Sequence, residues 1–182
     1  MPRYVAFLRA INVGGHIVKM DDLRTLFESM KFKQVETFIA SGNVIFETSL
    51  KPVADLQTKI QDCLHKALGY QVATFLRTDA EVAAIARSTP FPDAAIASAA
   101  AFCVGFLDAP LTTDAERRAM TFRTAVDDFR VHGSELYWLC QLKQSESTFS
   151  NVLFEKTLGL RATFRGMSTI RKLAATYPPL NV

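Results

Sequence analysis

The apolar residues of this chain follow two alternating patterns, short continuous runs and helical spacings of three and four residues. Residues 4–9 form the first run, which contains no glycine or proline and predicts a buried strand. Apolar residues then recur at helical spacing over residues 23–30, after Asp21 and Asp22, either of which can accept hydrogen bonds at a helix start. The pattern predicts a strand that leads through a polar loop into an amphipathic helix.

The next elements complete a recognisable order. Two β-rich runs flank the turn triplet Ser41-Gly42-Asn43 and predict a hairpin. A helical stripe follows between Pro52, which suits a first turn, and Gly69, which suits a C-terminal cap. The two strands of the hairpin cover residues 35–40 and 44–46, the helix covers residues 53–67, and a fourth strand covers residues 71–76. The order strand, helix, strand, strand, helix, strand is that of a ferredoxin-like plait, an antiparallel sheet with both helices on one face.

The second half of the chain repeats this order. Its predicted strands cover residues 102–107, 128–131, 136–140 and 162–165. Its predicted helices begin at a capping box over residues 113–116, cover residues 150–158, and end with a terminal helix through Tyr177. We therefore predict an α+β fold class with two tandem ferredoxin-like α/β plait domains, antiparallel sheets and a C-terminal helix.

The boundary between the two plaits is predicted from breakers and small residues. A capping box over residues 78–81 opens a helix, and the prolines and alanines of residues 89–100 predict a connector. The predicted domains are a first plait, a helix with linker, and a second plait with the terminal helix: residues 1–78, 79–100 and 101–182. Domains of this size bury a low fraction of their surface, so we expect them to pack on each other.

Composition places the chain among globular proteins. It has 182 residues, of which 49% are hydrophobic and 21% charged. No apolar run reaches the roughly 20 residues that span a bilayer, and the N-terminus lacks a signal-peptide profile, so we expect a cytoplasmic protein without a membrane partner. Cys63, Cys103 and Cys140 are odd in number and stand among apolar neighbours, which favours buried thiols over disulfides or a metal site. We expect no metal and no cofactor.

The loop after the first strand carries the most suggestive polar residues. Gly14 and Gly15 lie between a predicted strand and a predicted helix, where exposed backbone amides can hold an anion. The phosphate loop and the dinucleotide fingerprint are both missing from the sequence, and a glycine pair also serves simply to turn the chain. The candidate ligand-binding residues are Arg9, Asn12, Gly14, Gly15, Lys19, Ser41, Asn43, Arg165 and Thr169. Thr169 can alternatively act as a plain helix cap.

The charge of the chain is modest and unevenly distributed. The net charge is +3, and the region from Lys143 onward holds six basic and two acidic residues, a net charge of +4. This region allows nucleic-acid binding through Lys156, Arg161, Arg165, Arg171 and Lys172, although ordinary solvated helix faces are the favoured explanation because no run of consecutive basic residues occurs. Residues 42–47 lack the aromatic signature of RNA-recognition modules, so base stacking is unsupported.

Catalytic patterns are scarce. His16, His65 and His132 are isolated, and none has metal-ligand or nucleophile-activating spacing. Asp127 and Asp128 are adjacent in a predicted strand, where successive side chains point to opposite faces and cannot share acid and base work. An enzyme whose site is assembled from both domains stays open.

Three stretches identify a family resemblance. The segments LRAINVGG, ASGNV and ATFRGMSTIRKL resemble the bacterial domain-of-unknown-function 1697 family over nearly the whole chain. The resemblance implies two tandem α/β plaits, and the family's name indicates no particular activity. The family's C-terminal motif reads T-x-R-N-W-x-T; Thr163, Arg165 and Thr169 match it, while Gly166 and Met167 replace the Asn and the Trp. Any ligand contact made by those two family residues is weakened or lost here.

Three functional hypotheses follow. The leading one is a binding protein for a small anionic or phosphate-bearing ligand at the cleft between the two plait domains. The alternatives are a nucleic-acid-binding protein that uses the basic C-terminal region, and an enzyme with a site shared between domains. The sequence leaves the oligomeric state open.

Overall fold

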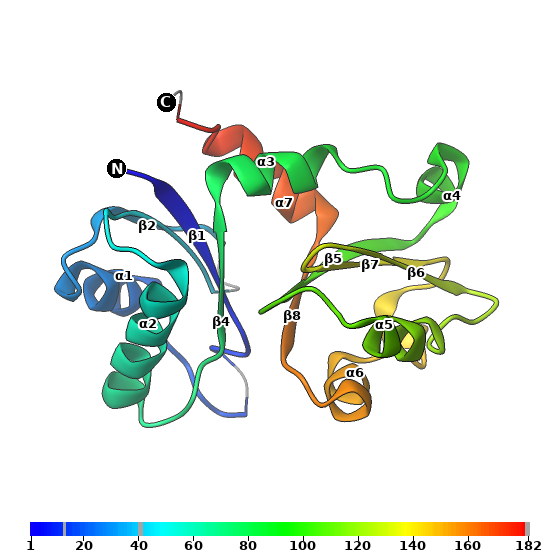
Figure 1. Ribbon diagram of the computed structural model, residues 1–182, viewed down its shortest axis with the longest axis horizontal. Helices are drawn as coiled ribbons and strands as arrows, with labels where there is room; N and C mark the ends of the chain where they lie inside the picture. Colours follow the sequence, from blue (N-terminus) through cyan, green and yellow to red (C-terminus); the bar gives the residue numbers. More distant parts are fainter. Residues whose placement is uncertain (13, 40–41, 181–182) are drawn as a thin grey trace. The chain divides into compact units, whose positions relative to one another are not determined.

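The computed structural model describes residues 1–12, 14–39 and 42–180 (Figure 1). The chain divides into two compact units. The first unit comprises Met1–Ile85 together with Lys172–Val182, and the second comprises Ala86–Arg171.

The first unit is a four-stranded antiparallel sheet with the strand order β2-β3-β1-β4. Its elements are β1 (Arg3–Leu8), α1 (Met20–Ser29), β2 (Lys33–Thr37), β3 (Asn43–Glu47), α2 (Val53–Leu68), β4 (Thr74–Thr78) and α3 (Asp79–Arg87), of which α3 runs on into the second unit. Helices α1 and α2 lie on one face of the sheet (Figure 1). The predicted plait is confirmed here, although α1 begins one residue before Asp21 and the fourth strand lies later than residues 71–76.

The second unit has the same topology, with the strand order β6-β7-β5-β8. Its elements are α4 (Asp93–Ser98), β5 (Ala101–Leu107), α5 (Thr113–Met120), β6 (Asp127–His132), β7 (Glu135–Cys140), the 3-10 turn η1 (Gln144–Glu146), α6 (Asn151–Leu158), β8 (Ala162–Gly166) and α7 (Met167–Thr176), which continues into the first unit. The predicted α+β class with two tandem domains and a C-terminal helix is confirmed. The predicted connector contains the short helix α4, because its alanines favour helix once Pro92 has set the first turn.

The two predicted capping boxes have different outcomes. Thr78 and Glu81 cap the start of α3, since the Thr78 amide donates to Glu81 Oε2 at 2.7 Å and the Glu81 amide donates to Thr78 Oγ1 at 3.2 Å. The box predicted to begin at Thr113 is wrong by one residue. Thr112 is the N-cap of α5, and its hydroxyl accepts from the Ala115 amide at 3.2 Å.

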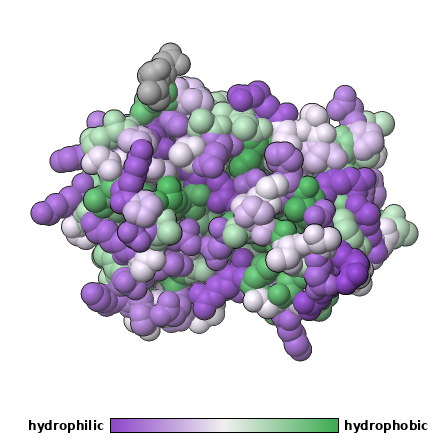
Figure 2. Space-filling view, in the orientation of Figure 1, coloured by the Kyte–Doolittle hydropathy of each residue, from purple (hydrophilic) through white to green (hydrophobic). Residues whose placement is uncertain are grey.

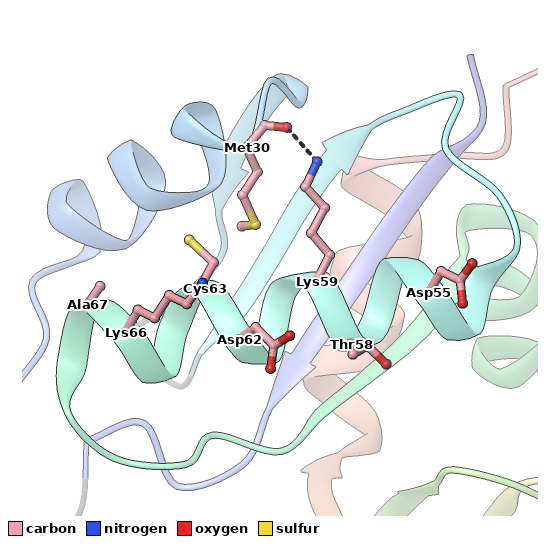
Figure 3. Close-up of a pocket in the computed structure, with 8 residues that line it drawn as sticks. All are labelled: Met30, Asp55, Thr58, Lys59, Asp62, Cys63, Lys66 and Ala67. Carbon is pink, nitrogen blue, oxygen red and sulfur yellow. Dashed lines mark hydrogen bonds between the residues drawn. The ribbon is translucent and has the colours of Figure 1, made fainter.

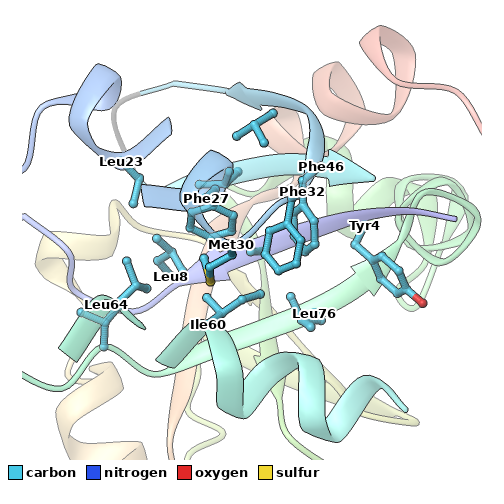
Figure 4. Packing of buried hydrophobic residues seen from close by; sticks show 14 of the residues in the cluster. Tyr4, Leu8, Leu23, Phe27, Met30, Phe32, Phe46, Ile60, Leu64 and Leu76 are labelled. Carbon is cyan, nitrogen blue, oxygen red and sulfur yellow. The ribbon is translucent and has the colours of Figure 1, made fainter. Parts of the chain in front are cut away.

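Aromatic and aliphatic side chains fill the space between the first sheet and its helices (Figure 4). Phe46 on β3 packs against Phe27 of α1 and Phe32, with ring centroids 5.5 Å and 4.6 Å apart. Leu56, Ile60 and Leu64 form the buried stripe of α2. The predicted helical spacing thus identifies the inward face of both helices.

The core of the second unit is richer in aromatic rings. Trp138 and Phe149 have ring centroids 4.8 Å apart, and Phe149 lies 5.7 Å from Phe164. Gly105 makes room for Phe164, because a Cβ at that glycine would lie 2.7 Å from the ring. A buried carboxylate, Asp127, accepts hydrogen bonds from the Trp138 indole at 2.8 Å and the Ser147 hydroxyl at 2.9 Å.

Register and sequence relate the two units. Val5 pairs with Arg77 across β1 and β4, and Val104 pairs with Arg165 across β5 and β8. The strands that contain these valines continue as VAFLRA and VGFLDA. The last residue of β1, Leu8, donates its backbone amide to Gly42 O, just before β3, at 2.8 Å. The last residue of β5, Leu107, donates in the same way to Ser134 O, just before β7, at 2.9 Å. Positions in one unit can therefore be matched to positions in the other.

The second helix of each plait differs in length. Helices α2 and α6 both end at a glycine in the left-handed conformation, Gly69 with φ 81° and Gly159 with φ 69°. Aligned at these caps, α2 has 16 residues and α6 has 8. Helix α6 therefore lacks about two turns at its start, and residues 143–150, which include η1, take their place.

The C-terminal segment binds to the first unit. The Tyr177 hydroxyl donates to Glu36 Oε2 at 2.6 Å, Arg3 donates to Pro178 O at 3.2 Å, and the Leu180 amide donates to Asp79 Oδ2 at 2.9 Å. Burial, together with this contact to the Glu36 carboxylate, raises the pKa of Tyr177 to about 12. The segment is thus held by hydrogen bonds to three separate parts of the first unit.

Hydrophilic side chains cover much of the face seen in Figure 2, with hydrophobic side chains between them. Ile17, in the loop before α1, is 87% exposed. Within the part of the chain that the structure describes, no helix has the length and apolarity required to cross a membrane.

Candidate functional site

The corner between β1 and α1 is built on two glycines and two aromatic residues. Gly14 and Gly15 have φ angles of 64° and 85°, and a Cβ at either would meet nothing within 4 Å, so these positions favour glycine for the backbone conformation alone. The Tyr70 hydroxyl donates to Ile11 O at 2.9 Å, and its ring stacks on His16 with centroids 3.9 Å apart. This corner is therefore braced from the end of α2.

The electrostatic setting of this corner is mixed. Arg9 is partly buried and Lys19 is exposed at the start of α1, where no side chain caps the helix. Asp21 and Asp22 occupy the first turn, and their carboxylates already interact favourably with the helix dipole. An anion bound at this helix start would be repelled by both of them.

Other predicted site residues of the first unit have internal roles. The Asn12 side-chain oxygen accepts from the Val18 amide at 2.7 Å and closes the loop. Asn43 is 0% exposed, and its amide donates to Phe38 O at 2.9 Å. Ser41 lies outside the described residues. Arg9, Asn12, Gly14, Gly15 and Lys19 thus belong to the first unit, whereas Arg165 and Thr169 belong to the second.

A pocket of about 300 Å³ opens at the start of α6 in the second unit. We call it the α6 pocket, and its lining residues come from β5, β7, η1, the start of α6 and the end of β8: Cys103, Trp138, Gln144, Phe149, Ser150, Asn151, Phe164, Arg165 and Gly166. Residues 53–60 of α2 occupy the matching place in the first unit and bury Leu56 and Ile60 against the sheet. The α6 pocket therefore lies where the second unit lacks two helical turns.

Two side chains of the pocket cap the edge strand β8. Arg165 Nη1 donates to Phe164 O at 2.9 Å and to Thr163 Oγ1 at 2.8 Å. Asn151 Nδ2 donates to Ala162 O at 2.8 Å. Since the two carbonyls are two strand residues apart, they lie about 7 Å from each other. The two polar groups of the pocket are thus fixed along one sheet edge.

The first unit caps its own edge strand in a related way. Arg77 Nη1 donates to Leu76 O at 2.8 Å, as Arg165 does to Phe164 O. Gln61 stands eight residues before its cap glycine, as Asn151 does, and its Oε1 accepts from the Thr74 amide at 3.2 Å. Covering the outward groups of an edge strand prevents pairing with another chain. The arginine contact with the strand is therefore part of the repeated fold.

The matched amide side chains differ in one respect. In the second unit the Ala162 amide is taken by Glu155 Oε1 at 3.0 Å, so Asn151 turns its nitrogen to Ala162 O. Asn151 Oδ1 is buried, and no group in the described part of the chain donates to it. A buried acceptor without a donor is rare in folded proteins. Asn151 thus carries a fully buried acceptor next to the α6 pocket.

Charge at the α6 pocket is positive. Burial lowers the pKa of Arg165 to about 10, which still leaves the guanidinium protonated at neutral pH. Ser150 caps α6 by accepting from the Leu153 amide at 3.1 Å, and the first turn of α6 carries no acidic residue. An anion in this pocket meets the positive end of a helix dipole without the competing carboxylates of α1.

Burial disfavours the reactive form of the thiol in the α6 pocket. Burial raises the pKa of Cys103 to about 11, although a hydrogen bond from Gln144 acts in the opposite direction. A thiol with this pKa is almost fully protonated at neutral pH, and the thiolate is the reactive form. The arrangement therefore favours binding over covalent catalysis.

A second hollow lies along the exposed face of α2 (Figure 3). Lys59 donates to Met30 O at 3.3 Å and lies 5.5 Å from the centre of the Phe32 ring, so its stem covers the end of α1. Asp55, Lys59, Asp62 and Lys66 alternate in sign along the same side of the helix, as is typical of a solvated surface. This hollow lacks polar groups that converge on one point.

The plait topology and the helix-edge pocket describe a two-domain α+β protein with a candidate small-molecule site. A profile of a family described as proteins of unknown function, DUF1697, matches residues 1–137, and the chain belongs to this family. Among solved structures, the chain is similar to the conserved bacterial protein SP0830 from Streptococcus pneumoniae. The two share 23% sequence identity with a TM-score of 0.73, over 97% of this chain and 98% of that one. The search of curated proteins gave no match.

The region of the α6 pocket is where sequence reasoning was least complete. The family match ends at residue 137, before Gln144, Ser150 and Asn151. Arg165 was a candidate, but these three residues were missed because none belongs to a recognised motif. The available signal was the predicted helix length, since residues 53–67 and 150–158 occupy the same place in the two plaits and differ by about two turns.

Proposed function

We propose that this protein binds a small anionic ligand in the α6 pocket. The observation that carries the proposal is the replacement of two helical turns by a pocket that is lined by an arginine. In the first unit the same space is filled by the apolar start of α2. A concave site with a few fixed polar groups and an apolar wall is the usual form of a small-molecule site.

The proposal is supported by the chemistry of the lining. Arg165 supplies a planar cation suited to carboxylate or phosphate groups, and none of the residues that line the pocket is acidic. Phe149 and Phe164 supply an apolar wall. The position of Arg165 is set by its bond to Phe164 O, so its guanidinium is held in place before a ligand arrives.

The corner of Gly14 and Gly15 receives less support as the anion site. Its helix start carries Asp21 and Asp22, whereas α6 carries no acidic residue in its first turn. Nucleic-acid binding through the basic C-terminal region also receives less support. Arg165 is partly buried, and the Arg171 guanidinium carbon lies 5.8 Å from the centre of the Phe102 ring.

The proposal is tested by measuring binding with matched arginine variants. Isothermal titration with phenylacetate and with inorganic phosphate is compared for the wild type, Arg165→Met and Arg77→Met. Methionine keeps the unbranched apolar stem of the side chain but removes the guanidinium group and its charge. We expect at least one anion to bind the wild type, and at least tenfold weaker binding to Arg165→Met, since one lost charge-assisted hydrogen bond accounts for that factor.

Arg77→Met is the matched control, because it removes the equivalent edge contact from the unit without the pocket and leaves ligand affinity unchanged. Arg9→Met locates the site independently. Loss of binding in Arg9→Met but not in Arg165→Met would place the anion at the glycine corner and overturn the proposal. Absence of binding by either anion to the wild type would overturn it as well.

A further inference from the structure

A separate hollow of about 330 Å³ lies in the second unit, between the loop after β5 and the end of α6. It is lined by residues 107–112, by Ala115 of α5 and by residues 158–161, and we call it the α5 hollow. None of these residues lines the α6 pocket. Arg118 on α5 donates to Thr157 O on α6, so the two helices beside the α5 hollow are tied together.

In the first unit the matching place is filled by Tyr70. This residue directly follows the cap glycine of α2, as Leu160 directly follows the cap glycine of α6. The Tyr70 hydroxyl donates to Ile11 O at 2.9 Å, and Ile11 is buried. In the aligned segments VAFLRAI and VGFLDAP, Ile11 matches Pro110, which is exposed. The second unit therefore leaves open a place that a phenol ring covers in the first.

The loops beside this place differ in the same sense. In the first unit residues 9–19 connect β1 to α1, and His16 from this loop stacks on the Tyr70 ring with centroids 3.9 Å apart. The connection between β5 and α5 covers residues 108–112 alone, and none of these five residues is aromatic. The second unit thus lacks both the ring and the side chain that stacks on it.

The α5 hollow has the size and the lining for one aromatic ring. Leu107 is buried, and Leu111, Leu158 and Leu160 are half-buried around it. An apolar cavity of about 150 Å³ can hold benzene, so about 330 Å³ admits a ring with a substituent. The charged lining residues, Asp108 and Arg161, have opposite signs. This balance favours a neutral ligand over an ion.

The surroundings of the α5 hollow favour a small molecule over a docked protein. Exposed apolar side chains that gather in one patch mark protein interfaces. Within the described part of the chain, none of the large hydrophobic residues that are exposed lines the α5 hollow. Its exposed lining includes the polar residues Asp108, Thr112 and Arg161. The hollow is therefore an isolated apolar depression with polar residues beside it.

We infer that the α5 hollow binds a small neutral phenol, whose ring takes the place that the Tyr70 ring has in the first unit. The ring packs against Leu111, Leu158 and Leu160. The hydroxyl donates to a backbone carbonyl of residues 108–112, as the Tyr70 hydroxyl donates to Ile11 O. This site is distinct from the α6 pocket, so the inference does not rest on the proposed function.

The inference is tested by titrating phenol and fluorobenzene into the isotope-labelled full chain. The two probes are similar in size, but fluorobenzene has no hydroxyl group to donate. Backbone amide chemical shifts report both the affinity and the place of binding. We expect saturable shifts at Leu111, Ala115 and Leu160, and about fivefold tighter binding of phenol, the factor given by one net hydrogen bond.

Two variants fill the α5 hollow from different sides. Leu160→Tyr supplies the ring that the first unit has, and Ala115→Leu adds a larger side chain from α5, where both residues favour helix. We expect the phenol-dependent shifts to disappear in each. Leu142→Tyr is the matched control, because Leu142 is 41% exposed and lies outside the lining, so phenol affinity stays unchanged.

Circular dichroism establishes which variants are folded, and either filled variant is sufficient. If neither folds, the comparison of phenol with fluorobenzene in the wild type decides. Absence of saturable shifts at the α5 hollow, equal affinity for the two probes, or phenol binding that persists in a folded filled variant overturns the inference. Tighter binding of N-acetyltyrosinamide than of phenol overturns it in favour of a tyrosine side chain from another protein. The proposed function is tested separately, by anion binding at Arg165.

Discussion

The two units share one topology and differ in how completely their second helix covers the sheet. In the first unit, 16 residues of α2 bury Leu56, Ile60 and Leu64. In the second, the 8 residues of α6 bury Phe154, and the uncovered region is the α6 pocket. Both units keep the same glycine cap and the same arginine on the edge strand. The glycine cap and the edge-strand arginine therefore belong to the shared fold, whereas the α6 pocket is specific to the second unit.

The corners after the first strand of each plait also differ. Tyr70 fills the corner of the first unit by bonding to Ile11 O and stacking on His16. Leu160 holds the matching place after Gly159, and there the second unit has a hollow of about 330 Å³ lined mainly by apolar residues. The tyrosine therefore fills the corner of the first unit, whereas the leucine at the matching position leaves a hollow in the second.

The largest effect is expected at the buried carboxylate of the second sheet. Burial tends to raise the pKa of Asp127, but hydrogen bonds from Trp138, Ser147 and Thr124, with a further one from the Cys140 thiol, outweigh it and hold the pKa below its usual value. Asp127→Ala leaves these donors unsatisfied and should lower the free energy of unfolding by about 3 kcal/mol. Urea denaturation measures this loss.

Asp128→Ala is the matched control, because Asp128 is 41% exposed and its ion pairs with Arg123 and Arg130 contribute under about 1 kcal/mol. The stability due to Asp127 is present above the unfolded-state pKa and is lost as pH falls through the lower folded-state pKa. The difference between wild type and Asp127→Ala should therefore shrink in acid. A difference that stays constant down to pH 2 would contradict this account.

A smaller effect is expected at the glycine that distinguishes the two hairpins. Gly42 has φ 77°, and a Cβ there would lie 2.8 Å from Ile11 Cγ2, whereas the matching residue of the second unit is Ser134. Gly42→Ala should cost about 2 kcal/mol through strain and crowding. Gly14→Ala has the strain without the crowding and should cost about 1 kcal/mol. Equal losses in thermal unfolding would show that Ile11 moves aside freely.

Replacing Tyr70 by the leucine found at the matching position tests whether this tyrosine stabilises the corner of the first unit. Tyr70→Leu gives the first unit the residue found in the second and removes both the bond to Ile11 O and the stacking on His16. We expect a loss of about 1.5 kcal/mol in urea denaturation. Tyr70→Phe keeps the ring but loses the hydrogen bond to Ile11 O, which should cost about 1 kcal/mol. An unchanged stability in both variants would mean that Tyr70 does not brace the corner.

The smallest effect concerns the C-terminal segment of the first unit. Tyr177 has its pKa raised to about 12 by burial and by its bond to Glu36. Its stabilising contribution is complete below the unfolded-state pKa of about 10 and is lost as pH rises through the folded-state value. Tyr177→Phe should therefore differ from the wild type at pH 8 and match it near pH 12. A difference that grows with pH would reverse the sign of this linkage.

Hydrophobic periodicity was sufficient to predict the fold, because each strand and helix buries one face against its own sheet. The helical spacing of apolar residues over 23–30 and 53–67 correctly predicted which side chains of α1 and α2 are buried. Boundaries were less accurate where tertiary contacts decide them. The strand predicted at residues 71–76 starts at Thr74, since Ala73 instead accepts from the Arg9 amide in the turn region.

The candidate site was only partly predictable, because it depends on contacts between residues far apart in sequence. Arg165 could be singled out by its charge, but its neighbour Asn151 becomes informative only once Glu155 is seen to occupy the Ala162 amide. Asn43 reads as a polar turn residue, yet the fold buries it and uses its amide to hold Phe38 O. Sequence gives the types of residue, and the register of the strands determines which of them meet.

The central claim is that the space left by the shortened α6 binds a small anion. Backbone amide chemical shifts, recorded while phenylacetate is titrated into the isotope-labelled wild type, test it most directly because both candidate corners are observed in one experiment. The account predicts saturable shifts at Ser150, Asn151, Phe164 and Gly166, with Gly14 and Gly15 unchanged. Shifts confined to Gly14, Gly15 and Lys19, or no saturable shift anywhere, would contradict it.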